Sequence, residues 1–194
     1  RAAEQLEAIA NLKADQLGAW FEGHMSTVRS IRALPLSLEA AMLRSVSGDG
    51  RSIGAWLRAL RQQNGYASAA IYDSRGRLLA IEGQVDITHA SDVRTTLVDQ
   101  REIIVEDIHV HAGEPRMSLW VPLTEAPDAH VTAWLLLEID PRSSVFPALR
   151  DVPLSSPTLE MVLWRREGDS AVVLDRIGTD SAIARLITDT SSIV

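Results

Sequence analysis

The N-terminal segment carries the longest uninterrupted helical pattern of the chain. From Glu4 to about Arg32, apolar residues recur at intervals of three and four, with charged residues between them and no proline. The pattern predicts one amphipathic helix, roughly 40 Å long at about 1.5 Å per residue. That exceeds what a compact domain of this size needs for its core, so we expect the helix to connect two places. Its bulkiest residues, Trp20 and Phe21, are expected to be buried against a sheet.

Shorter helices and a set of strands are predicted after this helix. The helices, at 36–46 and 53–63, are separated by SGDGRS, in which Ser52 can cap the second helix. Helices followed by mostly antiparallel strands with short connections predict an α+β fold, in which the long helix packs on a five-stranded sheet. The strands are expected at 67–73, 77–82, 102–111, 116–123 and 131–139, with a polar helical segment at 90–100.

The strand VTAWLLLEI, residues 131–139, is apolar at successive positions. This is typical of a strand that is covered on both faces. We expect one face of the sheet to lie on the long helix and the other to face the short helices and loops. A pocket is therefore expected between the sheet and the segments around 52–66 and 90–101.

The composition changes after Asp140 and Pro141, where the proline-rich stretch PALRDVPLSSP follows. Beyond it, MVLWRREGDSAVVL, residues 161–174, predicts a hairpin around Gly168 that would begin a second unit. The expected organisation is a helix at 1–35, a main domain at 36–145, a linker at 146–157 and a partial second unit of the same kind at 158–194.

The composition excludes some classes of protein. Of the 194 residues, 46% are hydrophobic and 23% are charged, which is ordinary for a globular protein. The net charge of −7 argues against a nucleic-acid-binding surface, which needs basic residues. There is no cysteine, no apolar stretch long enough for a membrane span and no signal-peptide core. Because the chain opens directly in a helical pattern, we expect it to be an excised part of a longer protein.

Four segments together resemble the extracytoplasmic Cache domains, which are PAS-like sensor modules of bacterial transmembrane receptors. They are the helix with AIANLKADQLGAWF, the hairpin AIYDSRGRLLA, the strand pair RMSLWVPL and VTAWLLLEIDP, and the segment SSPTLEMVLWRREGD. The resemblance is to the periplasmic regions of sensor histidine kinases and diguanylate cyclases. It implies a ligand-sensing domain in the periplasmic portion of an inner-membrane protein, with the second unit nearer the membrane. It also implies that 69–83 form the first two strands of the sheet.

One departure from the family pattern limits the ligand that the resemblance implies. Amino-acid-binding members carry a series of tyrosine, arginine, tryptophan and aspartate residues. Here Trp56, Arg58, Tyr66 and Asp107 supply the residue types without the spacing. The resemblance therefore implies a small, polar ligand, and an amino-acid ligand is not carried over from the family.

Candidate ligand-binding residues lie on and between the predicted strands. Asp107, His109 and His111 alternate along a predicted strand and would share one face, where they could bind a metal ion or sense pH. Successive same-face residues are about 6.5–7 Å apart, so three of them converge on one ion only if the strand bends or another strand helps. The ordinary alternative is a polar face exposed to solvent. Trp120 and Trp134, in neighbouring predicted strands, could line a pocket or belong to the hydrophobic core. Arg116, which follows Pro115, could bind an anionic ligand through its guanidinium or could be exposed to solvent. The candidates are Tyr66, Asp107, His109, Arg116, Trp120 and Trp134.

No enzyme is predicted from the motifs. The chain has no GxSxG, HExxH or Walker loop, so catalysis, a cofactor or a bound metal is not expected. The main alternative to a ligand sensor is a structural or interaction module in which both sheet faces are fully packed and the long helix mediates a homodimer or contacts a partner protein.

Overall fold

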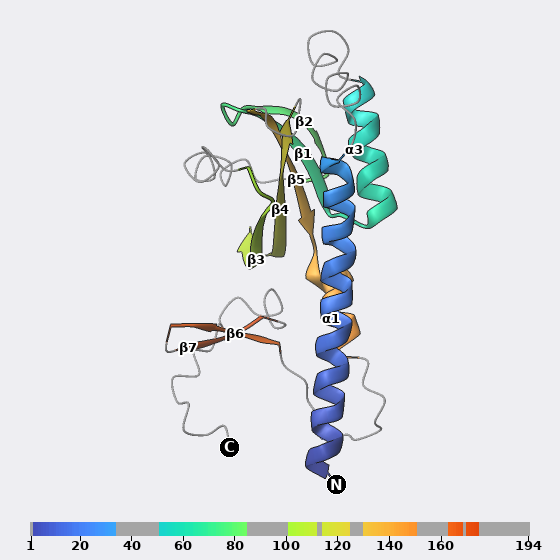
Figure 1. Ribbon diagram of the computed structural model, residues 1–194, viewed down its shortest axis with the longest axis vertical. Coiled ribbons are helices and arrows are strands. Elements are labelled where there is room, and N and C mark those ends of the chain that lie inside the picture. The colour runs from blue at the N-terminus through green and yellow to red at the C-terminus, as the bar shows by residue number, and fades with distance from the viewer. Residues whose placement is uncertain are drawn as a thin grey trace. The chain divides into compact units, whose positions relative to one another are not determined.

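The computed structural model describes residues 2–33, 51–84, 101–111, 114–124, 130–150, 163–168 and 170–174. Within these residues the chain is α+β, with a long N-terminal helix, a five-stranded sheet and a separate two-stranded sheet (Figure 1). The predicted helices at 36–46 and 90–100 lie outside the described residues.

The helices follow the predicted pattern closely. Helix α1 spans Ala2–Arg32 and helix α3 spans Arg51–Asn64. In α1, Glu4 lies in the first turn and Arg29 in the last, so both charges are favourable to the helix dipole. Helix α3 is followed by Gly65, whose positive φ of 70° is the usual conformation of a residue just after a helix.

The main sheet is antiparallel and its strand order is β2-β1-β5-β4-β3. All five strands lie within a few residues of their predicted bounds, and the predicted hairpin at 69–83 is confirmed as β1 and β2. Asp73 makes the tight turn of this hairpin, because its Oδ1 accepts hydrogen bonds from the backbone N–H groups of Arg75 and Arg77. The strands are β1 Ser68–Asp73, β2 Leu78–Glu82, β3 Ile104–His111, β4 Glu114–Thr124 and β5 Val131–Ile139.

After β5 the chain forms a short 3-10 turn, η1 Pro141–Ser143, and helix α5, Val145–Arg150. The predicted second hairpin is confirmed as β6 Trp164–Glu167 and β7 Ser170–Val173, which are antiparallel and turn at Gly168.

The chain divides into two compact units. Unit 1 comprises residues 1–22, 108–115 and 141–194, and unit 2 comprises 23–107 and 116–140. Unit 2 therefore holds the C-terminal part of α1, helix α3 and most of the main sheet. The domain boundaries expected from the sequence stay a prediction.

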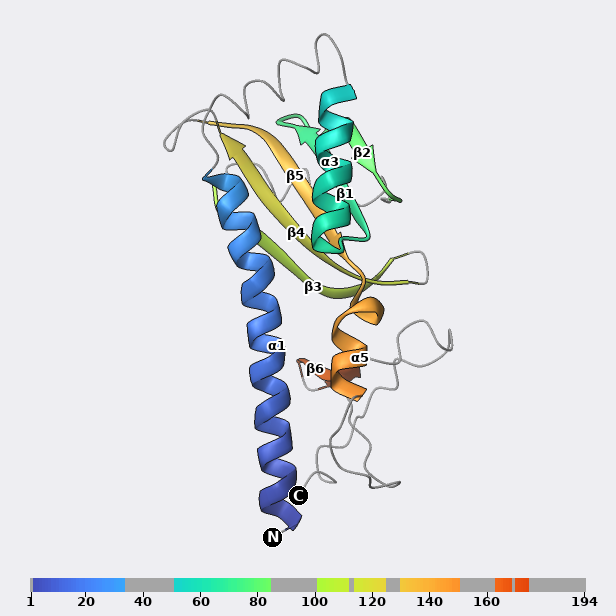
Figure 2. The same cartoon turned by 90° about the vertical axis from the view of Figure 1, so that its right-hand side faces the viewer.

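In unit 2, both helices cover the same face of the sheet. Figures 1 and 2 show α3 and the end of α1 on one side of the strands. Val28 of α1 and Leu57 of α3 are fully buried there, and Arg58 of α3 pairs with Glu82 of β2 at 2.8 Å. The expectation that the helix at 53–63 would cover the other face is therefore wrong. Periodicity identifies the apolar stripe of a helix, but it does not identify the face that the stripe covers.

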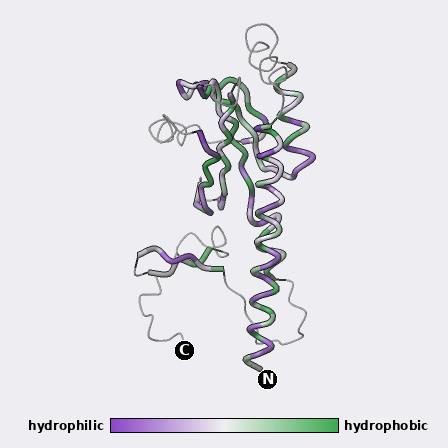
Figure 3. Tube along the Cα trace, in the orientation of Figure 1, coloured by the Kyte–Doolittle hydropathy of each residue, from purple (hydrophilic) through white to green (hydrophobic). Residues whose placement is uncertain are grey.

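The central strands are apolar on both faces, as the sequence predicts for β5. Figure 3 shows hydrophobic residues concentrated along the strands of the sheet. Leu135 and Leu137 of β5 are fully buried on the helix-covered face, and Trp134 and Leu136 are 4% exposed on the other. We call this other face the ligand face, because the candidate site described below lies on it.

Candidate functional site

Three aromatic side chains from three strands meet on the ligand face. Tyr72 of β1 lies opposite Trp134 of β5, and Trp120 of β4 lies opposite Leu136 of β5. The rings of Tyr72 and Trp120 are tilted by 46° with centroids 5.5 Å apart, which is a favourable aromatic geometry. We call Ala70, Tyr72, Trp120, Trp134 and Leu136 the aromatic cluster; its members are at most 4% exposed.

A buried carboxylate lies one step further along the same face. Glu138 of β5 is 5% exposed and lies between Ser68 of β1 and Ser118 of β4, which are its partners in the register of the two neighbouring strands. Ser68 Oγ donates a hydrogen bond to Glu138 Oε2. A buried ionised carboxylate is unfavourable unless donors or cations surround it. Glu138 is therefore out of place in an ordinary sheet core and suits a site that receives a cation.

The next residues along these two strands carry opposite charges. Arg116 of β4 and Asp140, which follows β5, form an ion pair with Nη1 and Oδ2 at 3.5 Å. Their side chains are 16% and 20% exposed. The polar end of the ligand face thus contains two carboxylates, Glu138 and Asp140, and one guanidinium.

The aromatic cluster also contains a hydrogen-bond donor without a partner. The indole Nε1 of Trp120 is buried, and within the described part of the chain no acceptor is in hydrogen-bonding distance. An indole N–H can only donate, and a buried donor is normally paired. An acceptor supplied by a ligand would satisfy it.

The structure brings together some of the sequence-predicted site residues. Trp120 and Trp134 belong to the aromatic cluster, and Arg116 lies on the same strand as Trp120, four residues earlier. All three lie in unit 2 and on strands β4 and β5. The structure therefore places half of the predicted candidates on the ligand face.

The other candidates lie elsewhere. Tyr66 is 3% exposed and follows α3, where its ring packs against His24 of α1 with centroids 5.4 Å apart. On β3, Asp107 is exposed and His109 is partly buried. Among the described residues no group of three or more His, Cys, Asp or Glu side chains could hold a metal ion, and the side chain of His111 is outside them. Ligand contacts by these residues stay a prediction.

Sequence reasoning missed Tyr72, Ser68 and Glu138. Glu138 carried a usable signal, because it is the only acid in the apolar run VTAWLLLEI. An acid in a strand that is buried on both faces must itself be buried, and a buried acid is a candidate for function. Tyr72 and Ser68 carried no comparable signal, since their neighbours depend on the strand register.

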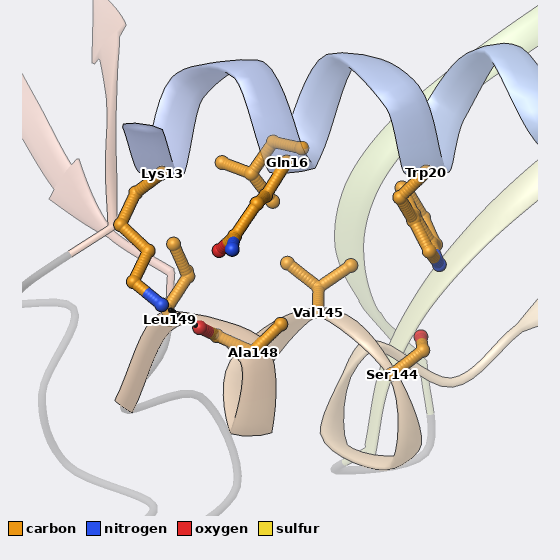
Figure 4. Close-up of a pocket in the computed structure, with 8 residues that line it drawn as sticks. Lys13, Gln16, Trp20, Ser144, Val145, Ala148 and Leu149 are labelled. Carbon is orange, nitrogen blue, oxygen red and sulfur yellow. Dashed lines mark hydrogen bonds between the residues drawn. The ribbon is translucent and has the colours of Figure 1, made fainter. Parts of the chain in front are cut away.

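Unit 1 contains a small hollow between α1 and the η1–α5 segment (Figure 4). Its volume is about 30 Å³, enough for water-sized occupants only. Lys13 at one end is 5% exposed and its Nζ donates a hydrogen bond of 2.7 Å to the carbonyl of Ala148. The hollow is lined by Lys13, Gln16, Leu17, Trp20, Ser144, Val145, Ala148 and Leu149.

Trp20 lines this hollow and is only partly buried, as is Phe21. The expectation that both are buried is therefore wrong. Trp20 instead lies at the η1–α5 segment, where it lines the hollow together with Ser144 and Val145. The buried apolar residues of α1 are instead Ile9, Val28 and Ile31, of which only Val28 is fully buried.

Solved structures with the same fold are sensory domains of bacterial receptors. The ligand-binding domain of the Pseudomonas aeruginosa amino acid chemoreceptor PctC, in complex with GABA, matches with a TM-score of 0.55 at 17% identity, over 78% of this chain and 66% of that one. The sensory domain of the Campylobacter jejuni chemoreceptor Tlp3 (CcmL) matches with a TM-score of 0.51 at 10% identity, over 89% and 88%. A domain of a sensory box/GGDEF family protein from Vibrio parahaemolyticus matches with a TM-score of 0.50 at 11% identity, over 89% and 88%.

At these identities the likeness shows the fold. It confirms the α+β fold, with a long N-terminal helix and a five-stranded antiparallel, PAS-like sheet, that the Cache resemblance implied. The chain spans just under two thirds of the PctC domain, at 66% of its length. No protein-family model matches the chain, and no curated protein matches it in sequence. None of the helices in the described ranges has the length and hydropathy of a membrane span.

Proposed function

We propose that this chain is the non-catalytic, extracytoplasmic ligand-sensing domain of a membrane-bound signalling receptor. Its ligand would be a small molecule with a protonated amine, and binding would be relayed to a cytoplasmic output domain such as a histidine kinase or a diguanylate cyclase. The fold supports this proposal because PctC and Tlp3 are chemoreceptors that carry the same arrangement of helices and strands. A shared fold alone does not assign function, so the site must carry the argument.

The buried carboxylate of Glu138 is the observation that carries the proposal. It lies two residues beyond Leu136 of the aromatic cluster on the same strand face and accepts a hydrogen bond from Ser68. Ammonium groups bind favourably against aromatic faces and carboxylates, most strongly where water is excluded. Counting Glu138 and Asp140 against Arg116, the polar end has one surplus negative charge, which a protonated amine would neutralise. The solved PctC domain holds GABA, and Tlp3 has been solved with isoleucine; both ligands carry an amine.

The second candidate function is a ligand-free module that dimerises or binds a partner through α1. The Trp120 N–H, which has no acceptor among the residues that the structure describes, and the buried Glu138 favour ligand binding over this alternative, because a fully packed structural face has no need of either. Both functions allow a homodimer through α1, and we expect the chain to form one.

Calorimetric titration with n-butylamine and GABA tests the proposed function. We expect binding of at least one of these amines to the wild-type chain, and at least about tenfold weaker binding to Glu138→Gln, because a charge-assisted hydrogen bond contributes about 1.5–3 kcal/mol. The matched control is Glu102→Gln, which removes an exposed carboxylate and should leave affinity unchanged. Circular dichroism establishes that both variants are folded. The absence of amine binding, or equal affinity of Glu138→Gln and wild type, would contradict the proposed function.

A further inference from the structure

Lys13 of α1 is a charged side chain that is buried inside unit 1. It is 5% exposed, and its Nζ donates a hydrogen bond of 2.7 Å to the carbonyl oxygen of Ala148 in α5. Figure 4 shows Lys13 at one end of the hollow between α1 and α5, and Trp20 at the other end. Replacing a buried charge by an apolar group of similar size is often neutral or stabilising. Stability alone therefore does not account for a lysine at this contact.

The acceptor of this hydrogen bond belongs to the last turn of α5. The last four carbonyl groups of an α-helix have no N–H donor within the helix itself. Helix α5 spans Val145–Arg150, so Ala148 contributes one of these four carbonyl groups. Lysine side chains can bond such carbonyls at the C-terminus of a helix, and here the lysine comes from a different helix, 135 residues away in the sequence. The hydrogen bond thus joins one defined position of α1 to one defined position of α5.

The apolar contacts between α1 and α5 do not define a register. Four apolar side chains border the hollow, Leu17 and Trp20 from α1 and Val145 and Leu149 from α5. Contacts of this kind are non-directional, so they permit α1 to shift along α5. After a shift by about one helical turn, four residues along α1, Ile9 or Leu17 would take the place of Lys13, and neither side chain can donate a hydrogen bond. Lys13 therefore distinguishes the observed register from the neighbouring ones.

We propose that Lys13 is a register lock, which fixes the position of α1 along α5 at a cost in stability. A single buried polar residue has this role in coiled coils, where one Asn or Lys in the apolar seam specifies the register and lowers stability. Helix α5 follows β5, the strand that carries Glu138, through η1. The lock thus fixes α1 against the segment that leaves this strand, so that a displacement of the segment is passed on to α1. The inference goes beyond the proposed function, because the lock requires no ligand.

The distance between two spin labels tests the register. The chain has no cysteine, so labels can be placed selectively at Asp15→Cys on α1 and Pro147→Cys on α5, two exposed positions. Pulsed dipolar electron spin resonance should give one narrow distance distribution when Lys13 is present. Lys13→Met keeps an unbranched side chain of similar length but removes the donor, so the distribution should broaden or shift by up to about one turn, 5.4 Å. The Tm of Lys13→Met should equal or exceed that of wild type, because the buried charge is gone.

The matched control is Gln16→Leu, which removes a polar side chain of α1 beside the same hollow and should leave the distance distribution narrow. An unchanged distribution in Lys13→Met would overturn the inference, and so would a broad distribution in the chain that retains Lys13. Broadening together with a lower Tm, or loss of folding, would mean that Lys13 serves stability and would overturn it as well. All these measurements are made without ligand, so none of their outcomes bears on amine binding at Glu138.

Discussion

Glu138 combines two properties that a residue selected only for stability would not combine. Its side chain is 5% exposed, and its position in the sheet is flanked by two serines rather than by a cation. Replacing buried polar groups by apolar ones of similar shape is often neutral or stabilising. Leucine, as found at the neighbouring positions of β5, would therefore serve the core at least as well, and the carboxylate points to ligand binding.

The tryptophans of the chain differ in how much stability they should contribute. Trp134 is 4% exposed within the aromatic cluster, so Trp134→Ala should destabilise the chain by about 3–5 kcal/mol. Trp20 is only partly buried beside the hollow of unit 1, so Trp20→Ala should lower the free energy of unfolding by about 1 kcal/mol. Urea unfolding followed by circular dichroism measures both. Equal losses would mean that Trp20 is as well packed as a core residue.

His24 should make stability depend on pH. Burial lowers the pKa of His24 below its ordinary value of 6.5. Its Nδ1 lies 3.4 Å from the hydroxyl of Tyr66, which burial keeps protonated by raising the pKa of Tyr66 to about 12. The unfolded chain therefore binds a proton at His24 more readily than the folded chain as the pH falls through 6.5, and stability is lost below that pH.

The measurement is the free energy of unfolding of wild type and His24→Gln from pH 8 to pH 5. The wild-type chain should lose stability relative to the variant below about pH 6.5, with a slope of at most about 1.4 kcal/mol per pH unit for one proton. Above pH 7 the difference in the free energy of unfolding between wild type and His24→Gln should not change with pH. A difference that stays constant over the whole range would show that folding does not perturb His24.

Among the elements, those with a strong local signal were predictable. The long helix was expected to begin at Glu4 and begins at Ala2, and β5 was expected at 131–139 and spans those residues. Both patterns are local, because the spacing of apolar residues within one element determines them. The side of the sheet covered by α3 was not predictable, since it depends on contacts between residues far apart in the chain.

The candidate site depends on register in the same way. Trp120 and Trp134 could be chosen as large aromatics in strands, but the partners Tyr72 and Glu138 follow from the pairing of β1 with β5 and of β5 with β4. A shift of one residue would send these side chains to the helix-covered face. Tyr66 was selected for its residue type, and its packing against His24 was not readable from the sequence.

Gly83 should be essential for the end of the β1–β2 hairpin. Its φ is +91°, and a Cβ added there would lie 2.6 Å from the carbonyl oxygen of Ala67. Gly65 offers a matched control, because its φ is +70° but a Cβ there would meet no atom within 4 Å. Gly65→Ala should therefore cost only the left-handed backbone conformation, about 1–2 kcal/mol, and Gly83→Ala distinctly more. Thermal unfolding of the two variants compares these losses of stability. Equal shifts in Tm would mean that the backbone around Ala67 moves to make room for the Cβ at no cost in stability.

At the scale of the whole molecule, the chain is two units that share α1, and every residue of the proposed ligand site lies in unit 2. Residues Ser68, Tyr72, Arg116, Trp120 and Glu138 all belong to it. Asp140 is the last residue of unit 2, and Pro141 returns the chain to unit 1. The chain therefore passes from unit 2 to unit 1 directly after β5, the strand that carries Glu138.

Hydrogen exchange should reveal this division of the molecule. A ligand that binds only the folded form of unit 2 raises its free energy of opening by RT ln(1 + [L]/Kd), about 2.7 kcal/mol at one hundred times Kd. With GABA at that excess, amide exchange in β4 and β5 should slow by about a hundredfold wherever exchange requires unit 2 to open. Exchange in the β6–β7 hairpin of unit 1 should be unchanged, because that hairpin opens without releasing the ligand. Glu138→Gln at the same GABA concentration is the control, and exchange in β4 and β5 should be slowed at least about ninefold less than in wild type, since its affinity is at least about tenfold weaker. Equal slowing in both units would mean that they open together, which would contradict the expectation that the ligand protects unit 2 alone.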